Sequence, residues 1–405
     1  MRLSKRIITH FIVLGFVFSL SATDTKVADI IKKMTLREKI GQLFVISPEY
    51  LNPALLQKER DLKKNIGLTE LTQAEKNYYK KYSAGGFVLF AKNVKTPDQL
   101  LALNNQLHSL GLTSTRSHIK PFIFIDEEGG MVARIAGNSN FDVPRFENMY
   151  LIGSTVADNS NDSHTSTSSI TYRKTPAEDA FMVGQAIGNY LKDYDIDVDF
   201  APVADVNTNP ANPVIGERAF SSNPLIAGKL AFSMYSGLAS QNIGGCLKHY
   251  PGHGDTRTDT HLGYAETTKT WDELLTCELL PFIYCINNNA SMIMTAHISA
   301  PAVTKDKTPA SLSPYLINEK LRGELNYNGI VITDSLSMKA ITLNYSSADA
   351  AVLAFLAGND FILLPEHYEE AFHAIYVALE KGIISQDRLN QSLERIISYK
   401  LEHTK

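Results

Sequence analysis

The stretch GIVITD, residues 329–334, is a short apolar run that ends directly at an acidic side chain, Asp334. Residues 122–125 form a run of the same kind, which ends at Asp126. Continuous apolar runs without polar alternation are typical of parallel strands that are buried on both faces. Outward from these two, six more such runs occur, at residues 43–46, 86–90, 198–201, 245–247, 292–295 and 361–364.

The segments between these runs carry helix signals. A Thr followed three residues later by Glu or Gln fits a capping box, in which each side chain satisfies a backbone N–H group at the start of a helix. This spacing occurs at Thr35 and Glu38, Thr96 and Gln99, Thr175 and Glu178, and Thr270 and Glu273. Eight buried strands that alternate with helices predict an α/β fold, a (β/α)8 TIM barrel that forms a single domain over residues 27–402. A doubly wound open sheet is the alternative.

The composition is that of a globular protein with a large core. Of the 405 residues, 44% are hydrophobic and 20% are charged, which excludes a disordered chain. The formal net charge of −4 provides no basic surface for a polyanion, so we expect no nucleic-acid partner and a neutral or weakly charged substrate. Cys246, Cys277 and Cys285 lack the spacing of metal ligands, and we interpret them as buried small hydrophobic side chains.

The first 22 residues have the pattern of an export signal. Arg2, Lys5 and Arg6 precede an apolar run at residues 7–20, and small residues follow at positions 21 and 22. The run is too short to cross a bilayer comfortably. We therefore expect a cleaved signal peptide at residues 1–22, a periplasmic or secreted protein, and no stable membrane insertion after cleavage. An uncleaved N-terminal anchor is the alternative.

Two further segments depart from the strand and helix pattern. Residues 154–171 are dominated by Ser, Thr, Asn and Asp and predict a polar surface insertion, because they cannot bury enough apolar surface to fold alone. Residues 48–82 are rich in Lys, Glu and Leu and predict a helical excursion after the first strand. We interpret the charges of this excursion as a solvated face and assign them no function.

Polar side chains follow the predicted strands at the points where the strands end. They are Asp126, Asp205, Lys248 with His249, His297, and Asp334. Barrel enzymes build their active sites at the C-terminal ends of the strands, so we expect these side chains to share one rim. For Asp205 and His297 the sequence leaves two positions open, in contact with a substrate or behind the residues that touch it.

The strongest local motif lies in the loop after the fifth predicted strand. It reads KHYPGHGDT at residues 248–256 and continues, after a short gap, with DTH at residues 259–261. The glycines and the proline forbid a regular helix here, so the ionisable side chains lie in a flexible loop. This stretch resembles the signature of family 3 glycoside hydrolases, specifically of the β-N-acetylglucosaminidase branch. The resemblance extends from about residue 34 to residue 365, through segments 125–134, 200–206, 212–218, 333–335 and 357–360.

The resemblance implies roles for individual residues. Asp334 is expected to be the nucleophile that attacks the anomeric carbon and forms a covalent glycosyl intermediate, as retaining glycosidases require. His261, oriented by Asp259, is expected to be the general acid/base, because a carboxylate on one imidazole nitrogen leaves the other to transfer a proton near neutral pH. His253 in the same loop is the rival for this role. The expected substrate-binding residues are Asp126, Arg134, Arg218, Lys248 and His249.

The resemblance also implies an activity that needs no metal and no organic cofactor. We expect a monomeric, exo-acting, retaining β-N-acetylglucosaminidase, of the β-N-acetylhexosaminidase type, that acts on muropeptide cell-wall fragments or chitooligosaccharides. A glycoside phosphorylase on the same site, β-glucosidase-type specificity and a non-catalytic sugar-binding protein remain alternatives. The β-glucosidase branch usually adds a second domain that supplies a Glu as acid/base, and the position of the eighth predicted strand near the end of this sequence favours the glucosaminidase branch.

Overall fold

The computed structural model describes residues 22–155, 175–256 and 265–403. The expected signal peptide up to residue 21 and the polar insertion from residue 156 onward lie outside the described residues, as do Asp259 and His261. Within the described ranges, no helix is both long and apolar enough to cross a membrane.

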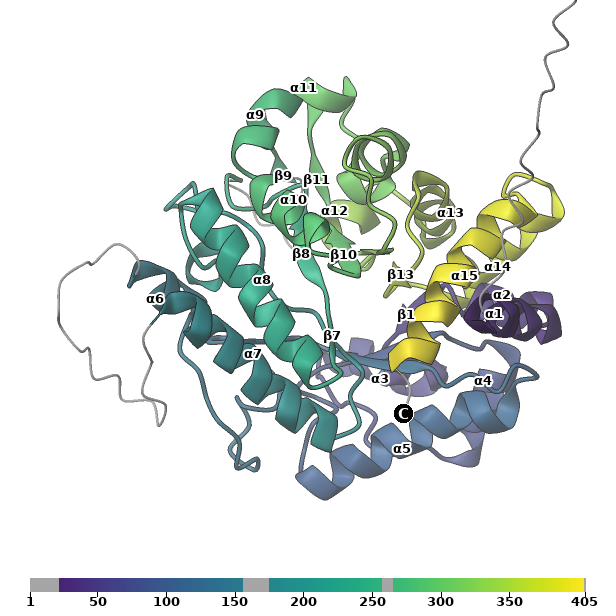
Figure 1. The fold of residues 1–405 in the computed structure, drawn as a ribbon. Coiled ribbons are helices and arrows are strands. Elements are labelled where there is room, and N and C mark those ends of the chain that lie inside the picture. The colour runs from purple at the N-terminus through teal and green to yellow at the C-terminus, as the bar shows by residue number, and fades with distance from the viewer. Residues whose placement is uncertain (1–21, 156–174, 257–264, 404–405) are drawn as a thin grey trace, which may run out of the picture.

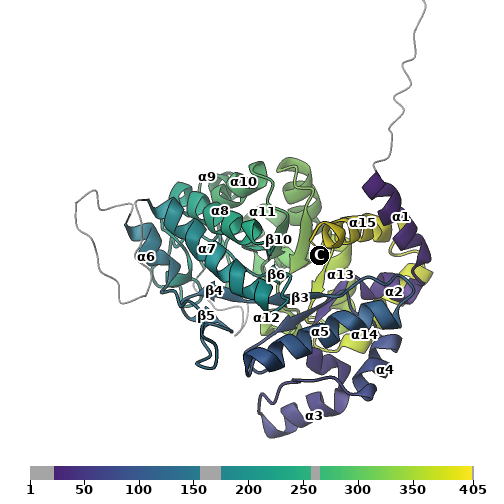
Figure 2. The same ribbon diagram turned by 60° about the horizontal axis from the view of Figure 1, so that its bottom comes forward.

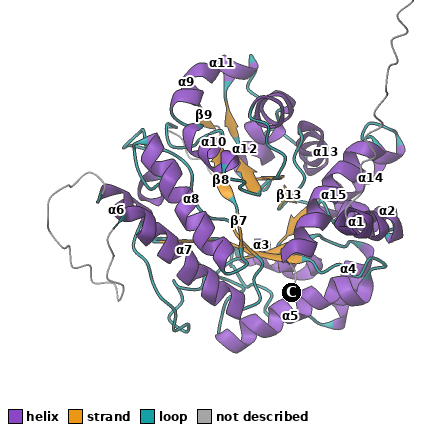
Figure 3. Ribbon diagram, in the orientation of Figure 1, coloured by secondary structure: helices purple, strands orange, loops and turns teal. Residues whose placement is uncertain are grey.

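The main strands of the described residues form two parallel sheets (Figure 3). The larger sheet has the order β13-β1-β2-β3-β6-β7, and the smaller has the order β12-β10-β8. Every predicted apolar run overlaps one of these strands, which are β1 Phe44–Ile46, β2 Gly86–Leu89, β3 Phe122–Ile125, β6 Val198–Asp199, β7 Gly244–Gly245, β8 Leu247–Tyr250, β10 Met292–Thr295, β12 Ile330–Thr333 and β13 Ile362–Leu363. Two small pairs flank them, β4 Glu127–Gly129 with β5 Val132–Ala133, and β9 Ala265–Glu266 with β11 Ile298–Ser299.

Backbone pairing links the two sheets. Phe361, next to β13, makes a parallel bridge with Ile332 of β12, and Val203, beyond β6, makes one with Lys248 of β8. Only Cys246 separates β7 from β8. The result is an α/β fold whose parallel strands form a half-barrel. The sequence predicts a closed barrel in a single domain, whereas the strand order gives two sheets that only these isolated bridges join.

Helices cover the strands on the outside. Figure 1 shows α5, α7, α8 and α15 around the strands, and the turned view of Figure 2 shows the same cover. The helices are α1 Ala22–Lys33, α2 Leu36–Gly41, α3 Pro53–Leu62, α4 Gln73–Lys81, α5 Pro97–Ser114, α6 Met149–Ser154, α7 Pro176–Asp193, α8 Pro224–Ser240, α9 Trp271–Thr276, α10 Leu280–Asn287, α11 Pro301–Thr304, α12 Lys339–Thr342, α13 Ser347–Ala357, α14 Tyr368–Glu380 and α15 Gln386–His403. Short 3-10 turns at Pro48–Leu51, Gly216–Arg218 and Ala310–Leu312 and a π-helix at Tyr315–Glu324 complete the set.

The four predicted helix starts are confirmed. A complete capping box forms at Thr35 and at Thr270, and at Thr96 and Thr175 the hydroxyl group accepts from the third backbone N–H group of the helix. Such caps are worth about 1 kcal/mol each, because they satisfy donors that the helix itself leaves unpaired. Helix α3, inside the predicted excursion, begins in the same way with Asn52 as its cap.

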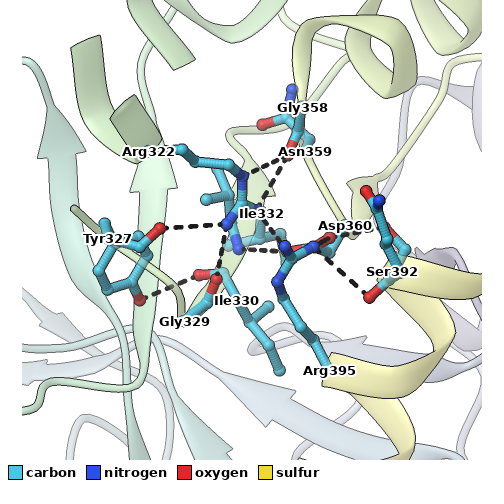
Figure 4. A network of polar contacts seen from close by, with 12 residues as sticks. Arg322, Tyr327, Gly329, Ile330, Ile332, Gly358, Asn359, Asp360, Ser392 and Arg395 are labelled. Atoms are coloured by element: carbon cyan, nitrogen blue, oxygen red, sulfur yellow. Dashed lines mark hydrogen bonds and ion pairs between the residues drawn. The ribbon is translucent and has the colours of Figure 1, made fainter. Parts of the chain in front are cut away.

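A buried ion network fastens the last helix to the strands (Figure 4). The carboxylate of Asp360 is fully buried and accepts from the guanidinium groups of Arg322, at 2.7 Å, and Arg395, at 3.1 Å. It also accepts from the Ser392 hydroxyl at 2.5 Å and from the Val331 N–H group at 3.0 Å. A buried charge is tolerated when it is paired and hydrogen-bonded in this way. The network therefore holds α15 against β12 at the end of the strand opposite to its carboxyl end.

Candidate active site

A pocket of about 920 Å³ opens at the carboxyl ends of the parallel strands. Because parallel strands end at the same edge, residues that are far apart in the chain meet there. Asp126 follows β3, Lys248 lies on β8 and Asp334 follows β12, and all three line this pocket. The predicted site residues that the pocket brings together are Asp126, Arg134, Arg218, Lys248, His249 and Asp334.

The segment after β3 carries three carboxylates in a row, and the first of them faces the pocket. Asp126 accepts from Lys248 Nζ at 2.7 Å, and the Arg134 guanidinium lies 3.6 Å from its other oxygen. Between Asp126 and Arg134 the chain reverses in the β4–β5 hairpin, where Gly129 and Gly130 have φ values of 87° and 58°. Residues with a side chain rarely adopt such φ values, so the two glycines allow Arg134 to return toward Asp126.

The second carboxylate anchors the returning chain. Glu127 accepts from the backbone N–H groups of Arg134, Ile135 and Ala136 at 2.6, 2.9 and 2.8 Å. The Tyr190 hydroxyl donates to it at 3.0 Å. Burial raises the pKa of Glu127 in spite of these donors. Glu127 therefore fixes the backbone that carries Arg134, and it does so from behind the pocket.

The third carboxylate, Glu128, joins two cations and is a site residue that the sequence analysis missed. Its side chain is 3% exposed, with Oε1 lying 2.6 Å from Lys248 Nζ and 2.7 Å from the Arg218 guanidinium. Arg218 Nε donates to Oε2 at 2.8 Å, which makes the contact with Arg218 bidentate. Burial alone would raise the pKa of Glu128, but the charges of Lys248 and Arg218 outweigh burial and hold this pKa well below its usual value.

The two cations are stabilised in turn. Burial alone would lower the pKa of Lys248, but Asp126 and Glu128 raise this pKa above its usual value. Burial likewise opposes the charge of Arg218, and Glu128 outweighs it and raises the pKa of Arg218. At neutral pH the wall of the pocket therefore carries fixed, matched charges. Such preorganised groups suit a ligand that carries polar groups but little net charge.

A buried aspartate orients the histidine of β8. His249 Nδ1 lies 2.7 Å from Asp205 Oδ2, and the backbone N–H groups of His249 and His253 donate to Asp205 Oδ1 at 3.2 and 2.6 Å. Burial alone would raise the pKa of Asp205, but the His249 charge outweighs burial and lowers it. Asp205 is fully buried and positions His249 from behind the pocket, which decides between the two positions that the sequence leaves open for Asp205.

Asp334 sits at the end of β12 with its carboxylate held by the next peptide group. Its own N–H group donates to Thr295 O at 2.8 Å, and Ser335 N–H donates to Asp334 Oδ1 at 2.7 Å. His297 Nε2 donates to Ser335 O at 2.8 Å, and its Nδ1 lies 2.7 Å from the Ser311 hydroxyl. His297 is buried and fixes the turn that follows Asp334.

The loop with the acid/base candidates is described only in part. Asp259 and His261 belong to residues 257–264, which lie outside the described residues, so their roles stay predictions. His253, the rival, lines the pocket, and its Nδ1 lies 2.7 Å from the Thr256 hydroxyl. Burial, with the neighbouring His249, lowers the pKa of His253. This favours a neutral imidazole at His253.

The three cysteines differ in their burial. Cys246 and Cys285 are buried as predicted, but Cys277 is only partly buried, because it lies at the C-terminal cap of the short helix α9. In the ranges that the structure describes, no group of three or more His, Cys, Asp and Glu side chains is arranged to hold a metal ion.

Comparisons with known proteins place the chain among hydrolases by sequence. Residues 35–399 match the Glycosyl hydrolase family 3 N terminal domain. The chain is similar to Beta-hexosaminidase A of Pseudoalteromonas piscicida, with 32% identity over 96% of this chain and 64% of that protein. It is also similar to a Beta-hexosaminidase of Hydrogenovibrio crunogenus, with 32% identity over 75% of this chain and 78% of that protein.

A solved structure gives the same result. The fold is similar to that of a glycoside hydrolase family 3 beta-N-acetylglucosaminidase from Paenibacillus sp. str. FPU-7, with a TM-score of 0.77 and 31% identity over 91% of this chain and 63% of that chain. The chain thus spans less than two thirds of the length of this protein and of the Pseudoalteromonas relative. The match over residues 35–399 shows that the chain belongs to glycosyl hydrolase family 3.

Proposed function

We propose that this protein is an exo-acting, retaining β-N-acetylglucosaminidase of the β-N-acetylhexosaminidase type. The observation that carries the proposal is the meeting of Asp334 with Lys248 and Arg218 around one pocket at the strand ends. The names of the relatives, beta-hexosaminidase and beta-N-acetylglucosaminidase, support a terminal β-linked N-acetylglucosamine unit as the group that is cleaved.

Asp334 is the nucleophile in this proposal. Its carboxylate attacks the anomeric carbon while the bond to the leaving oxygen breaks, and a glycosyl ester results. Water then attacks the same carbon, so the sugar leaves with its original configuration and the carboxylate is regenerated. The hydrogen bond from Ser335 N–H supports this role, because it fixes the orientation of the carboxylate.

The wall beside Asp334 suits a neutral sugar. Its cations are each matched by a carboxylate within 4 Å, with Lys248 between Asp126 and Glu128, Arg218 on Glu128, and Arg134 near Asp126. We propose that these groups and His249 bind the hydroxyl and N-acetyl groups. His261, oriented by Asp259, is proposed as the acid that protonates the leaving oxygen and the base that later activates water.

We also propose that the two sheets close into one (β/α)8 barrel, which forms a single catalytic domain over residues 27–402. The parallel bridges of Ile332 with Phe361 and of Val203 with Lys248 support closure, because they join β12 to the β13 edge and β6 to β8. With β7 and β8 counted as one interrupted strand, the order then runs once around a ring.

The remaining proposals concern the location and the partners. The charged start and the short apolar run support a signal peptide at residues 1–22 and a periplasmic or secreted protein. The substrate is proposed to be an oligosaccharide or a muropeptide fragment, with no nucleic acid involved. The net charge of −4 supports that exclusion, and a monomer is proposed.

Hydrolysis of an aryl β-N-acetylglucosaminide, compared with the aryl β-glucoside, tests the proposal. We expect a strong preference for the N-acetylated sugar, and formation of free sugar rather than sugar 1-phosphate when phosphate is added. Asp334→Ala should lower kcat by several orders of magnitude while the protein stays folded, and a 2-fluoro sugar inactivator should label Asp334. Near-normal turnover by Asp334→Ala, or preference for the glucoside, would contradict the proposal.

A further inference from the structure

One buried side chain joins two turns of the site that come from different parts of the chain. The first, residues 214–218, carries Arg218 into the pocket, and we call it the arginine turn. The second, residues 252–256, carries His253 into the pocket, and we call it the histidine turn. Asn212 lies between them, is 5% exposed and does not line the pocket itself. Asn212 therefore acts on a ligand only through the residues that it holds.

The carbonyl half of the Asn212 amide holds the arginine turn. Its Oδ1 accepts from the backbone N–H groups of Val214 and Ile215 at 2.8 and 2.9 Å. Both residues contact Arg218 in turn, because Val214 O accepts from the guanidinium group and Ile215 O accepts from the backbone N–H group, each at 2.9 Å. Asn212 thus fixes the backbone that sets the position of this guanidinium group.

The amino half of the same amide holds the histidine turn. Asn212 Nδ2 donates to His253 O at 2.7 Å and to the Thr256 hydroxyl at 3.4 Å. That hydroxyl also lies 2.7 Å from His253 Nδ1, so it contacts the imidazole itself. The turn approaches the chain before Asn212 so closely that a Cβ atom on Gly254 would lie 1.7 Å from Val206 O. The histidine turn therefore rests on the segment that leads to Asn212.

The four contacts leave the Asn212 amide one orientation. Its oxygen faces two N–H donors, and its nitrogen faces a carbonyl oxygen and a hydroxyl group. A rotation of the amide by half a turn would place donors against donors and its oxygen against a carbonyl oxygen. An ionised Asp offers acceptors alone, and a Lys offers donors alone. Both turns are therefore held together only when position 212 carries an amide.

The arginine turn has little apolar support of its own. A small cluster of buried side chains packs there, separate from the main hydrophobic core, and it consists of Val203, Ile215 and Ala219 with Val214 at its edge. Apolar burial stabilises in proportion to the buried area, so a cluster of this size fixes a turn only weakly. The hydrogen bonds of Asn212 therefore have a large share in positioning the arginine turn.

The proposed reaction needs both turns at once. The arginine turn belongs to the wall that is proposed to hold the sugar. The histidine turn contains His253, and the sequence runs on from it to His261, the proposed acid/base. Proton transfer to the leaving oxygen requires hydrogen-bond reach, so the two turns must keep a fixed distance. We infer that Asn212 is a positioning residue that sets the histidine turn relative to the sugar-binding wall. This inference rests on the proposed glycosidase function.

Two substitutions at position 212 separate the two halves of the amide. Asn212→Asp keeps an acceptor for Val214 and Ile215 but places a carboxylate oxygen against His253 O, whereas Asn212→Ala removes both halves. Asn223→Asp is the matched control. Asn223 Oδ1 also accepts from the N–H groups two and three residues further along the chain, but it does so at the start of α8, and Asn223 does not line the pocket.

Leaving groups of different quality show which turn has moved. kcat/KM reports the first step, in which a poor leaving group needs a proton and an activated aryl group does not. We expect Asn212→Asp to lower kcat/KM about 100-fold for a disaccharide of N-acetylglucosamine but less than about 3-fold for an activated aryl N-acetylglucosaminide. Inhibition by free N-acetylglucosamine should stay nearly unchanged. Asn212→Ala should in addition weaken this inhibition about 10-fold, because the arginine turn is released. Asn223→Asp should leave all three values unchanged.

The outcomes separate this inference from the proposed function. Equal losses on both leaving groups in Asn212→Asp would indicate a merely structural role and overturn the inference, as would wild-type values in both variants. If the wild type cleaves neither substrate, the proposed function fails, and backbone hydrogen exchange then tests the coupling of the two turns by itself. Asn212→Asp should speed exchange at Thr256 alone, and Asn212→Ala should speed it at Val214 and Ile215 as well. Wild-type exchange rates in both variants would overturn the coupling.

Discussion

Replacement of Glu128 by Gln tests whether the carboxylate between the two cations shapes the site. The variant keeps the size of the side chain but removes its charge. Its amide group places a donor against a neighbour that is itself a donor. Lys248 keeps Asp126 at 2.7 Å, whereas Arg218 loses its one ion-pair partner among the described residues. The buried guanidinium of Arg218 should therefore leave its present position or remain there uncompensated.

The size of the effect follows from burial and distance. Two unit charges about 4 Å apart attract each other by about 4 kcal/mol at an effective dielectric constant of about 20. Removal of one partner of a buried pair typically costs about 3 to 5 kcal/mol, because the other charge stays desolvated. We expect Glu128→Gln to lower the free energy of unfolding by about 3 kcal/mol. Displacement of the binding groups by about 1 Å should also lower kcat/KM about 100-fold.

Urea unfolding and steady-state kinetics on the aryl N-acetylglucosaminide measure both effects. Asp360→Asn is the matched control, because Asp360 is also a buried carboxylate among arginines but lies at the other end of β12. The control should lose similar stability while kcat/KM stays near that of the wild type. Equal kcat/KM in Glu128→Gln and the wild type would refute the reasoning.

The pH dependence gives a second check on Glu128. The folded protein holds the pKa of this carboxyl well below its ordinary value of 4.5, so the unfolded state binds more protons below that pH. The stabilisation is therefore complete above about pH 4.5 and is lost as the pH falls. The difference in unfolding free energy between wild type and Glu128→Gln should shrink between pH 5 and pH 3. A constant difference would mean that the fold does not lower the pKa of Glu128.

Three further predictions concern other parts of the chain. His261→Ala should slow the hydrolysis of substrates with poor leaving groups most, and added azide should partly restore the turnover of activated aryl substrates. Asp259→Asn should cause a milder loss of activity. An equal loss of activity on substrates with poor and with activated leaving groups would point to His253 as the acid/base. Burial lowers the pKa of Lys400 to about 7. Between pH 7 and 10 the unfolded state therefore binds more protons than the folded state, and the free energy of unfolding should rise with pH. Urea titrations of Lys400→Met should show a flatter rise. Mass spectrometry of exported protein should find a start near residues 21–23, and an intact Met1 in the cytoplasm would contradict this.

Local patterns predicted the strands and the helix starts well, because the signals that form them lie within a few residues. The run 330–333 and the strand β12 coincide, and the Thr270 cap needs only Glu273. The strand at 198–201 is shorter than predicted and ends at Asp199. Its continuation reaches Pro202, which has no N–H group to donate to a neighbouring strand.

Two features of the site depend on contacts that no local pattern contains. Glu128 forms ion pairs with Arg218 and Lys248, which are distant from it in the sequence. The only local sign of this site is a row of three acidic residues before two glycines. The direction in which α3 docks is also not encoded by its own periodicity. The sequence therefore predicts an ordinary solvated face for Lys63 and Lys64, whereas the structure places both on the wall of the pocket.

The fastening of α15 has a consequence for the order in which the chain is made. Synthesis proceeds from the N-terminus, so Ser392 and Arg395 are added after Asp360 and after the strand β12. Until they arrive, Asp360 lacks the partners that α15 supplies, and the strand that ends at Asp334 lacks its support at the other end. Support of the strand that ends at Asp334 is thereby tied to the synthesis of α15, and a product that stops before α15 leaves Asp360 with Arg322 and the Val331 N–H group as its partners.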